Sequence, residues 1–314
     1  MATPFQNRIF GCVIVKSINS NYNADFSHQP RTLPDGTVYA TDKVLKYSVR
    51  NWLKKTSPSD KVFYFKTLSD EMQPRDLGET YINLFGDFPK NEGKDKDVKN
   101  RKEVLKNLLT CIDVRLFGGT FAQKDVSLSL HGTTQITHGI NRFPDNAIYS
   151  EQIASPFRNA NDKSADSMQT TLGTQFKLRE GHYVHHFSVN PQNLTDLVTL
   201  SGGESLNDED IAKLKAGLSR GVTLYDSSAK AGTENELLLW VQLKPGSKLV
   251  LPSFVERITI ADDEKRTIDL SELSAILARE HVKAAIERIE IYYDKTVTTV
   301  KDAPAGAIFH EIHQ

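Results

Sequence analysis

Residues Ile9–Val15 read IFGCVIV, and the fold depends most on this nearly continuous apolar run. Apolar side chains on both faces of a strand are typical of a central strand that is covered on both sides. A polar stretch with turn residues follows at Asn19–Gly36, and a helical pattern comes next. The sequence therefore predicts a sheet whose central strand leads, through a polar excursion, into a covering helix.

The predicted helix begins at Thr41 or Asp42, either of which can cap its first turn, and runs to Lys55. Four basic residues fall within roughly 80° of arc on one face; they are Lys43, Lys46, Arg50 and Lys54. The opposite face carries Leu45, Val49 and Trp52. Like charges on one stripe repel each other, no acidic residue follows Asp42 in the helix, and a polyanion would relieve the repulsion. The alternative is a solvated basic face that binds nothing.

The rest of the chain alternates expected strands and helices with long polar segments. Expected strands are Val62–Phe65, the hairpin Val126–Leu130 with Gln135–Gly139, Tyr183–Val189, Glu236–Leu243 and the edge strand Arg288–Tyr293. Expected helices are Val104–Leu116, ended by Gly118 and Gly119, Asn207–Arg220, ended by Gly221, and Leu270–Glu280. Phe85–Arg101 and Asn159–Thr171 are predicted to be exposed loops. This order suits an α+β fold with a ferredoxin-like or RNA-recognition-type core, formed as one domain over residues 1–314 with insertions.

Composition places the chain among soluble globular proteins. Of its 314 residues, 39% are apolar and 25% are charged. Neither a membrane-length apolar run nor a signal-peptide pattern is present, and Cys12 and Cys111 lie in apolar segments, as expected of buried thiols in a reducing cytoplasm. Lysine and arginine total 39 against 40 acidic residues, so nucleic-acid binding would depend on local clusters at 43–55 and 94–106.

The sequence predicts neither a metal site nor a cofactor site. His185 and His186 are adjacent in an expected strand and point to opposite faces, while His182 and His186 lie about 13 Å apart. A further pair, in HEIH at His310–His313, falls in an expected frayed tail. Phosphate-binding loops, nucleophile elbows and dinucleotide fingerprints are all missing from the sequence.

Four sequence words, in their order and spacing, carry a family resemblance. They are NRIFGCVIVKSINSNYNADF at Asn7–Phe26, DVRLFGG at Asp113–Gly119, ASPFRN at Ala154–Asn159 and TLGT at Thr171–Thr174. The chain thus resembles the backbone subunit of type I CRISPR interference complexes (Cascade), the Cas-seven family, and most of all its subtype I-B branch. The resemblance implies a subunit that polymerises along CRISPR RNA, binds its phosphates without reading sequence, and presents guide bases to target DNA.

The resemblance also implies an architecture and a set of partners. The architecture is a palm, helical fingers inserted over approximately residues 66–140, and a protruding β-hairpin thumb over approximately residues 141–179. The partners are head-to-tail copies of the same chain, the large subunit, the 5′-handle-binding subunit and the endonuclease that processes CRISPR RNA.

Together, the basic helix and the resemblance indicate a set of RNA-binding residues. They are Asn19, Asn21, Arg31, Lys43, Lys46, Arg50, Arg115, Gly118, Gly119, Phe157 and Arg158. Several have structural alternatives. Gly118 and Gly119 can serve as a helix C-cap that needs positive φ, Arg115 can pair with Asp113 or cap carbonyls, and asparagine-rich loops are often only turns.

Two other functions remain possible at this stage. In type III relatives an aspartate in the loop after the first strand cleaves target RNA, and Asp25 occupies such a loop here. A lone aspartate without identified acid, base or metal partners is weak support for catalysis, so we interpret Asp25 as structural and expect no enzyme activity. The second alternative is a ferredoxin-like interaction domain that binds no RNA.

Overall fold

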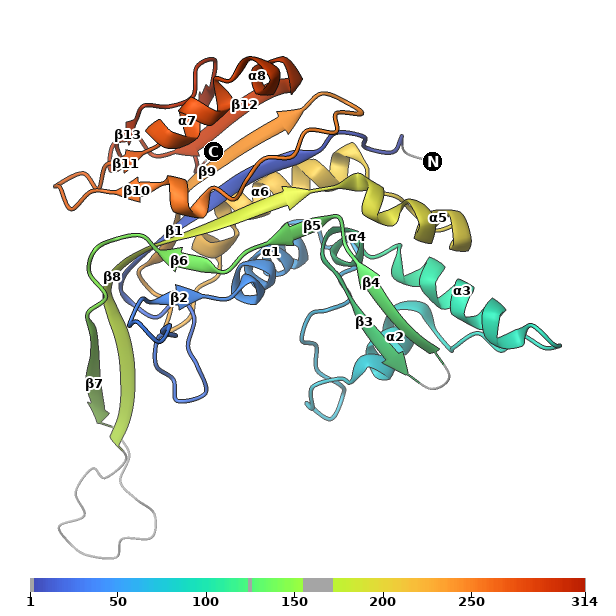
Figure 1. The fold of residues 1–314 in the computed structure, drawn as a ribbon. Coiled ribbons are helices and arrows are strands. Elements are labelled where there is room, and N and C mark those ends of the chain that lie inside the picture. The colour runs from blue at the N-terminus through green and yellow to red at the C-terminus, as the bar shows by residue number, and fades with distance from the viewer. Residues whose placement is uncertain (1–2, 124–125, 155–171, 314) are drawn as a thin grey trace, which may run out of the picture.

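A nine-stranded sheet runs through the computed structural model, which describes residues 3–123, 126–154 and 172–313 (Figure 1). In sheet order the strands are β14 (Ile308–His310), β12 (Ile286–Tyr293), β9 (Thr233–Leu243), β1 (Ile9–Ser20), β8 (Leu172–Val189), β6 (Gly139–Asn141) and β2 (Tyr39–Ala40). Two more, β5 (Thr134–Ile136) and β7 (Ile148–Ala154), also pair with β8. Strand β1 is antiparallel to both β8 and β9, so the predicted central strand is confirmed.

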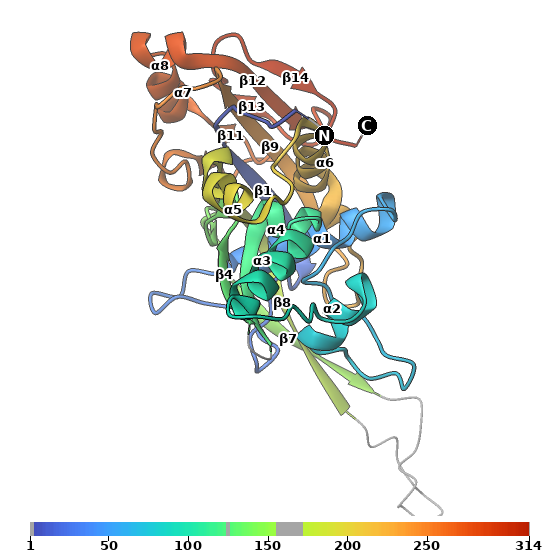
Figure 2. The ribbon, with the colours of Figure 1, turned by 90° about the vertical axis from the view of Figure 1, so that its right-hand side faces the viewer.

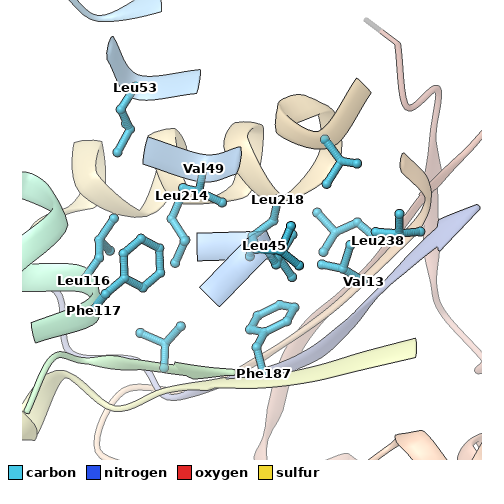
Figure 3. Close-up of a cluster of buried hydrophobic side chains, with 14 of the residues drawn as sticks. Val13, Leu45, Val49, Leu53, Leu116, Phe117, Phe187, Leu214, Leu218 and Leu238 are labelled. Atoms are coloured by element: carbon cyan, nitrogen blue, oxygen red, sulfur yellow. The ribbon is translucent and has the colours of Figure 1, made fainter. Parts of the chain in front are cut away.

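The apolar run of β1 divides between two cores. Ile9, Val13 and Val15 point into one cluster, while Phe10, Cys12 and Ile14 point into the cluster on the other face. The first cluster lies under helices α1 (Asp42–Thr56) and α6 (Asp208–Leu224) (Figure 3). Because both faces of β1 are covered, its sequence shows no polar alternation until Lys16.

A C-terminal layer covers the second face of the sheet. Its elements are the 3₁₀ turn Val255–Arg257, β10 (Thr259–Ile260), β11 (Ile268–Asp269), α7 (Ser271–Leu277), α8 (Glu280–Ala285) and β13 (Val300–Lys301). Strands β10, β11 and β13 form a small sheet of their own. Phe254, Leu273 and Ile258 from this layer pack into the second cluster.

A separate lobe extends beyond one end of the sheet (Figures 1 and 2). It contains α2 (Leu77–Phe85), α3 (Lys96–Leu108), α4 (Ile112–Phe117) and the hairpin β3 (Gly118–Gln123) with β4 (Val126–His131). A third cluster, with Tyr81, Leu105 and Phe121 among its members, is its core. The 3₁₀ turn Pro191–Leu194 and α5 (Thr195–Ser201) pack beside it.

Strands β7 and β8 form a hairpin that stands away from the body of the molecule (Figures 1 and 2). Its register runs from Ile148 opposite Leu178 to Ala154 opposite Leu172. The other end of β8 is buried in the main sheet, so one long strand joins the hairpin rigidly to the core.

Two strand predictions were wrong. Val62–Phe65 is not a strand, because the backbone N–H groups of Phe63 and Tyr64 donate to the Asp113 carboxylate (2.7 and 2.9 Å) instead of to a neighbouring strand. The expected hairpin over residues 126–139 is also absent: β4 pairs with β3, and β5 pairs with β8. Alternation of apolar and polar residues identified β4 and β5 as strands but not their partners.

Other segments differ from prediction at their ends. The helix expected from Val104 is divided by a turn into α3 and α4, and α3 begins at Lys96, within the expected loop. Helix α6 does not end at Gly221 but continues to Leu224. Because Gly221 has no side chain, α1 packs closely against α6 at this position. Strand β12 is not at the edge, since β14 pairs with it in parallel and orders the expected frayed tail.

The two cysteines, Cys12 and Cys111, are buried free thiols, as predicted. No helix in the described ranges is long and apolar enough to cross a membrane.

Candidate nucleic-acid interface

The basic face of α1 is partly neutralised, which corrects the prediction of an unrelieved stripe. Lys46 Nζ lies 2.9 Å from Asp42 Oδ2, one helical turn away, and Arg50 Nε lies 2.9 Å from Asp113 Oδ2 of α4. Partial burial favours the neutral carboxyl, yet the hydrogen bond and charge of Lys46 lower the pKa of Asp42. Lys43 remains 84% exposed, at 4.0 Å from Asp42. Lys43 is therefore the most available cation of the predicted set.

Asp113 joins α1 to the lobe. Its buried carboxylate accepts from Arg50 and from the two backbone N–H groups described above. The Arg50 guanidinium also lies over the Phe117 ring, 5.0 Å from its centroid. Only 12% of the Arg50 side chain is exposed, so this residue is held where α1 meets the lobe.

An open groove of about 500 Å³ adjoins the first turn of α1. Asp42 and Lys46 form one wall, and Gln135, Thr137 and His138 form another. Asp42 N donates to His138 Nδ1 (3.3 Å), which ties the two walls together. Lys46 thus supplies a cation to the wall of an open groove.

The start of α1 is tied to the loop that follows β1. Thr41 is the N-cap residue of α1, but its side chain makes no capping hydrogen bond to the helix. Its hydroxyl and its backbone N–H both donate to Asn23 Oδ1 (2.9 and 2.8 Å). The loop and the basic helix therefore hold a common position.

The loop asparagines hold the base of the hairpin. Asn19 is exposed with a φ of 48°, and its Oδ1 accepts from the Tyr149 hydroxyl of β7 (3.0 Å). Asn21 is buried, and its Nδ2 donates to the backbone oxygens of His28 (3.1 Å) and Phe176 of β8 (3.4 Å). Its Oδ1 is buried without a hydrogen-bond partner. Both residues are thus engaged in orienting the hairpin.

Two cations near these asparagines lack carboxylate partners in the described part of the chain. Arg31 is half-buried, and its Nε has no hydrogen-bond partner. Lys230 donates to the backbone oxygen of Tyr22 and lies 5.1 and 5.6 Å from the ring centroids of Tyr22 and Tyr225. Burial lowers the pKa of Lys230 to about 8. A bound anion would stabilise both cations. Sequence reasoning missed Lys230, because one lysine in a turn carries no periodic signal.

Asp25 closes a tight turn. Its Oδ1 accepts from Ser27 N (2.8 Å) and Gln29 N (3.0 Å), and the turn leaves the Phe26 side chain 99% exposed. Within the described ranges, Asp25 belongs to no group of three residues spaced to hold a metal ion. These contacts agree with the structural interpretation of Asp25.

Arg115, predicted to contact RNA, has internal partners in the structure. Its guanidinium makes a two-point ion pair with Asp210 (2.9 and 2.7 Å) and also donates to Glu204 Oε2 (2.9 Å) and Leu109 O (2.7 Å). The side chain is only 7% exposed. These internal partners leave Arg115 unavailable to a ligand.

The two glycines after α4 serve internal packing. Gly118 is the C-cap with a φ of 65°, as the structural alternative predicted, and a Cβ there would lie 2.0 Å from Leu130 O. At Gly119 a Cβ would lie 2.3 Å from the Tyr64 ring. Both close approaches are made by the protein itself. The remaining predicted residues, Phe157 and Arg158, lie outside the described residues.

The histidines of β8 are structural, and one is held between carboxylates. His185 contacts Tyr22 and His186 contacts Phe254, on opposite faces as predicted. Buried His182 lies 2.6 Å from Glu236 through Nδ1 and 3.2 Å from Glu180 through Nε2. Burial disfavours the imidazolium, yet the two carboxylates outweigh it and raise the pKa of His182 above 6.5.

This arrangement predicts a loss of stability in base. A raised histidine pKa stabilises the fold fully below the unfolded value of about 6.5, and the contribution is lost as pH rises through the folded value. His182→Gln is therefore expected to lower the free energy of unfolding by about 3–5 kcal/mol at pH 6 and to flatten its decline toward pH 9. Urea unfolding at several pH values measures both effects, with exposed His281→Gln as control. A variant with the wild-type decline would contradict this assignment.

The chain matches one protein-family model and several solved structures. The family model described as CRISPR-associated protein Cas7 matches residues 7–275. A chain of a solved "CRISPR RNA-guided surveillance complex, pre-nicking" has a TM-score of 0.52 and 15% identity, with coverage of 94% of this chain and 96% of that chain. A chain of another "CRISPR RNA-guided surveillance complex" has a TM-score of 0.46 and 15% identity, with coverage of 93% and 95%. At this identity, the first match bears on the fold alone. No curated protein sequence matches the chain.

Proposed function

Because this chain belongs to the CRISPR-associated protein Cas7 family, we infer that it is a CRISPR RNA-binding backbone subunit, and we propose how its surface holds the RNA. The family match over residues 7–275 is the observation that carries the function. We propose a path for the RNA between two projections: the β7–β8 hairpin and the α2–β4 lobe extend to the same side of the sheet, with α1 and β2 between them (Figures 1 and 2).

The sheet order supports a ferredoxin-like palm. Strands β9, β1, β8 and β6 lie side by side, with β1 antiparallel to both neighbours and with α1 and α6 on one face. This is the 4-1-3-2 strand order of the βαββαβ motif. In this assignment residues 1–314 form one palm domain with insertions. The lobe lies within the fingers expected at 66–140, and the hairpin lies within the thumb expected at 141–179.

We assign the phosphate contacts to cations between the two projections. Lys46 lines the groove beside α1, and Lys43 is exposed in the same first turns of that helix. Arg31 and Lys230 lie near the base of the hairpin without carboxylate partners among the described residues. Asn19 and Asn21 position the hairpin, and Arg50 positions the lobe. Point charges that bind phosphates do not read bases, which suits a subunit that leaves guide bases free to pair.

Partners beyond RNA follow from family membership. We propose head-to-tail contacts between copies of this chain, which need not close and so build a helical filament along the guide. The ends of the filament would meet the large subunit, the 5′-handle-binding subunit and the processing endonuclease in a subtype I-B complex in the cytoplasm. Target DNA would bind through pairing with the guide.

Family membership and the contacts of Asp25 both disfavour an endonuclease. Cas7 backbone subunits of Cascade are generally non-catalytic. The Asp25 carboxylate closes its own turn through Ser27 and Gln29 instead of joining other ligands in the described part of the chain. We propose that this chain holds RNA without cleaving it.

RNA that co-purifies with the chain tests the proposed function. When a tagged chain is expressed with a CRISPR array and its companion subunits, we expect bound RNA with repeat-derived ends and many different spacer sequences. The absorbance ratio at 260 and 280 nm detects the RNA, and sequencing identifies it. The same tag on an unrelated protein controls for adventitious RNA. A complex free of nucleic acid, or one enriched in a single spacer sequence, would contradict the proposal.

A further inference from the structure

Three side chains that the proposed function does not use converge where β12 and β14 end. Asp294 directly follows β12, while Glu311 and His313 follow β14. The two strands are parallel neighbours, with Tyr292 opposite His310, so the register brings residue 294 beside residues 311–313. One ligand atom from each of the three residues lies within 4.8 Å of the others. All three lie beyond residue 275, where the family match ends.

Neither Glu311 nor His313 has a side-chain hydrogen bond or an ion pair within 4.0 Å among the described residues, although the charge of His313 contributes to lowering the pKa of Asp294. Oε1 of Glu311 is buried and accepts no hydrogen bond, and His313 lies more than 4.0 Å from either carboxylate, beyond ion-pair distance. A carboxylate oxygen that is removed from water without a donor is costly. The carboxylates and the imidazole therefore approach one another without forming hydrogen bonds to one another, and a cation between them could be bound by all three.

Asp294 is already oriented for such a role. Its Oδ1 accepts from the backbone N–H and the hydroxyl of Thr296 (2.7 and 2.6 Å). Its backbone oxygen accepts from the N–H groups of Val297 (3.3 Å) and Thr298 (3.0 Å). These bonds fix the carboxylate, and Oδ2 accepts no hydrogen bond from a described residue. Hydrogen bonds of this kind orient ligands in known metal sites.

The nearest cations do not complete the cluster. Lys16 is paired with Glu234 at 2.6 Å, and Lys295 has an exposed side chain without an ion pair in the described part of the chain. The two carboxylates of the cluster therefore keep a local negative charge, which favours a divalent cation.

We propose that Asp294, Glu311 and His313 bind one divalent transition-metal ion, which fastens residues 308–313 to the end of β12. Two carboxylate oxygens and one imidazole nitrogen suit Zn²⁺ or Mn²⁺, whereas Mg²⁺ prefers oxygen ligands alone. Binding would bring the three ligand atoms, now within 4.8 Å of one another, to about 2.0–2.2 Å from the ion. Three protein ligands leave at least one position for water. Strand β14 has three residues and, among the described strands, pairs only with β12, so a cross-link at its end would add to a short ladder. This proposal differs from the sequence-based expectation, which was a frayed tail without a metal site at residues 310–313.

Titration of the full-length chain with ZnCl₂ or MnCl₂ tests this site independently of RNA. Calorimetry is expected to show one high-affinity ion per chain, and the ion is expected to raise Tm. The double variant Glu311→Gln/His313→Gln should lose at least about tenfold in affinity and lose the rise in Tm. Its matched control, Glu280→Gln/His281→Gln, removes an exposed glutamate and histidine from α8 and should behave as the wild type.

Three results would overturn the site. The first is a wild-type chain that binds neither ion at millimolar concentration. The second is a Glu311/His313 variant that retains the wild-type affinity and stoichiometry. The third is a control variant that loses binding equally. Thermal unfolding in EDTA controls for an effect of the substitutions themselves. Without bound metal, the wild type and the double variant should have the same Tm.

Discussion

Replacing Arg31, Lys43 and Lys46 together by glutamine is expected to weaken binding of single-stranded RNA about a hundredfold at 0.1 M salt. Each phosphate contact on a single strand contributes about 0.7 to the salt slope, so three contacts account for roughly two decades at this concentration. The loss should be the same for every RNA sequence, since phosphates carry no base information. Fluorescence anisotropy with unrelated oligonucleotides of equal length measures the effect.

A charge-matched control separates contact from net charge. Lys248, Lys265 and Lys283 are exposed, lie after β9 in the chain and do not line the groove beside α1, and replacing them by glutamine changes the net charge equally. We expect this control to lose little affinity. Equal losses in the two triple variants would indicate a general charge effect and would return α1 to the solvated-face interpretation.

Replacing Arg115 by leucine is expected to lower the free energy of unfolding by about 3–5 kcal/mol. The substitution leaves the Asp210 carboxylate, which is 4% exposed, without its two-point partner, and leaves Leu109 O without a donor. Urea unfolding measures the loss. RNA affinity of the folded variant should stay at the wild-type value, because Arg115 is buried away from any ligand.

An exposed arginine provides the control for this substitution. Arg279→Leu, at the start of α8, should change the free energy of unfolding by less than about 0.5 kcal/mol. An Arg115 variant that keeps wild-type stability but binds RNA weakly would restore the sequence-based assignment of Arg115 as an RNA contact.

The parts of the fold that could be predicted are those with a local signal. Strand β1 was predictable because, apart from Gly11, the residues from Ile9 to Val15 are all apolar, as expected for a strand that is buried on both faces. Helix α1 was predictable because its apolar face repeats at helical spacing. The partners of β4 and β5 were not, since alternation is the same whichever strand lies beside them.

The site was less predictable because its charges are paired over long distances along the chain. Arg50 meets an aspartate 63 residues away, and Arg115 meets one 95 residues away. A stripe of four cations therefore looks unrelieved in the sequence although Asp42 and Asp113 neutralise two of them. The function was predicted from family resemblance. The structure adds that Lys43 is exposed, with Asp42 4.0 Å away, whereas Arg115 is buried in a two-point ion pair.

The salt dependence of RNA binding tests the central claim most directly. The claim is that cations on α1 and in the preceding loop hold guide phosphates, and a plot of log Kobs against log salt counts those phosphates. The account predicts that the slope becomes shallower by about 2 when Arg31, Lys43 and Lys46 are replaced by glutamine. A folded variant with an unchanged slope would contradict it.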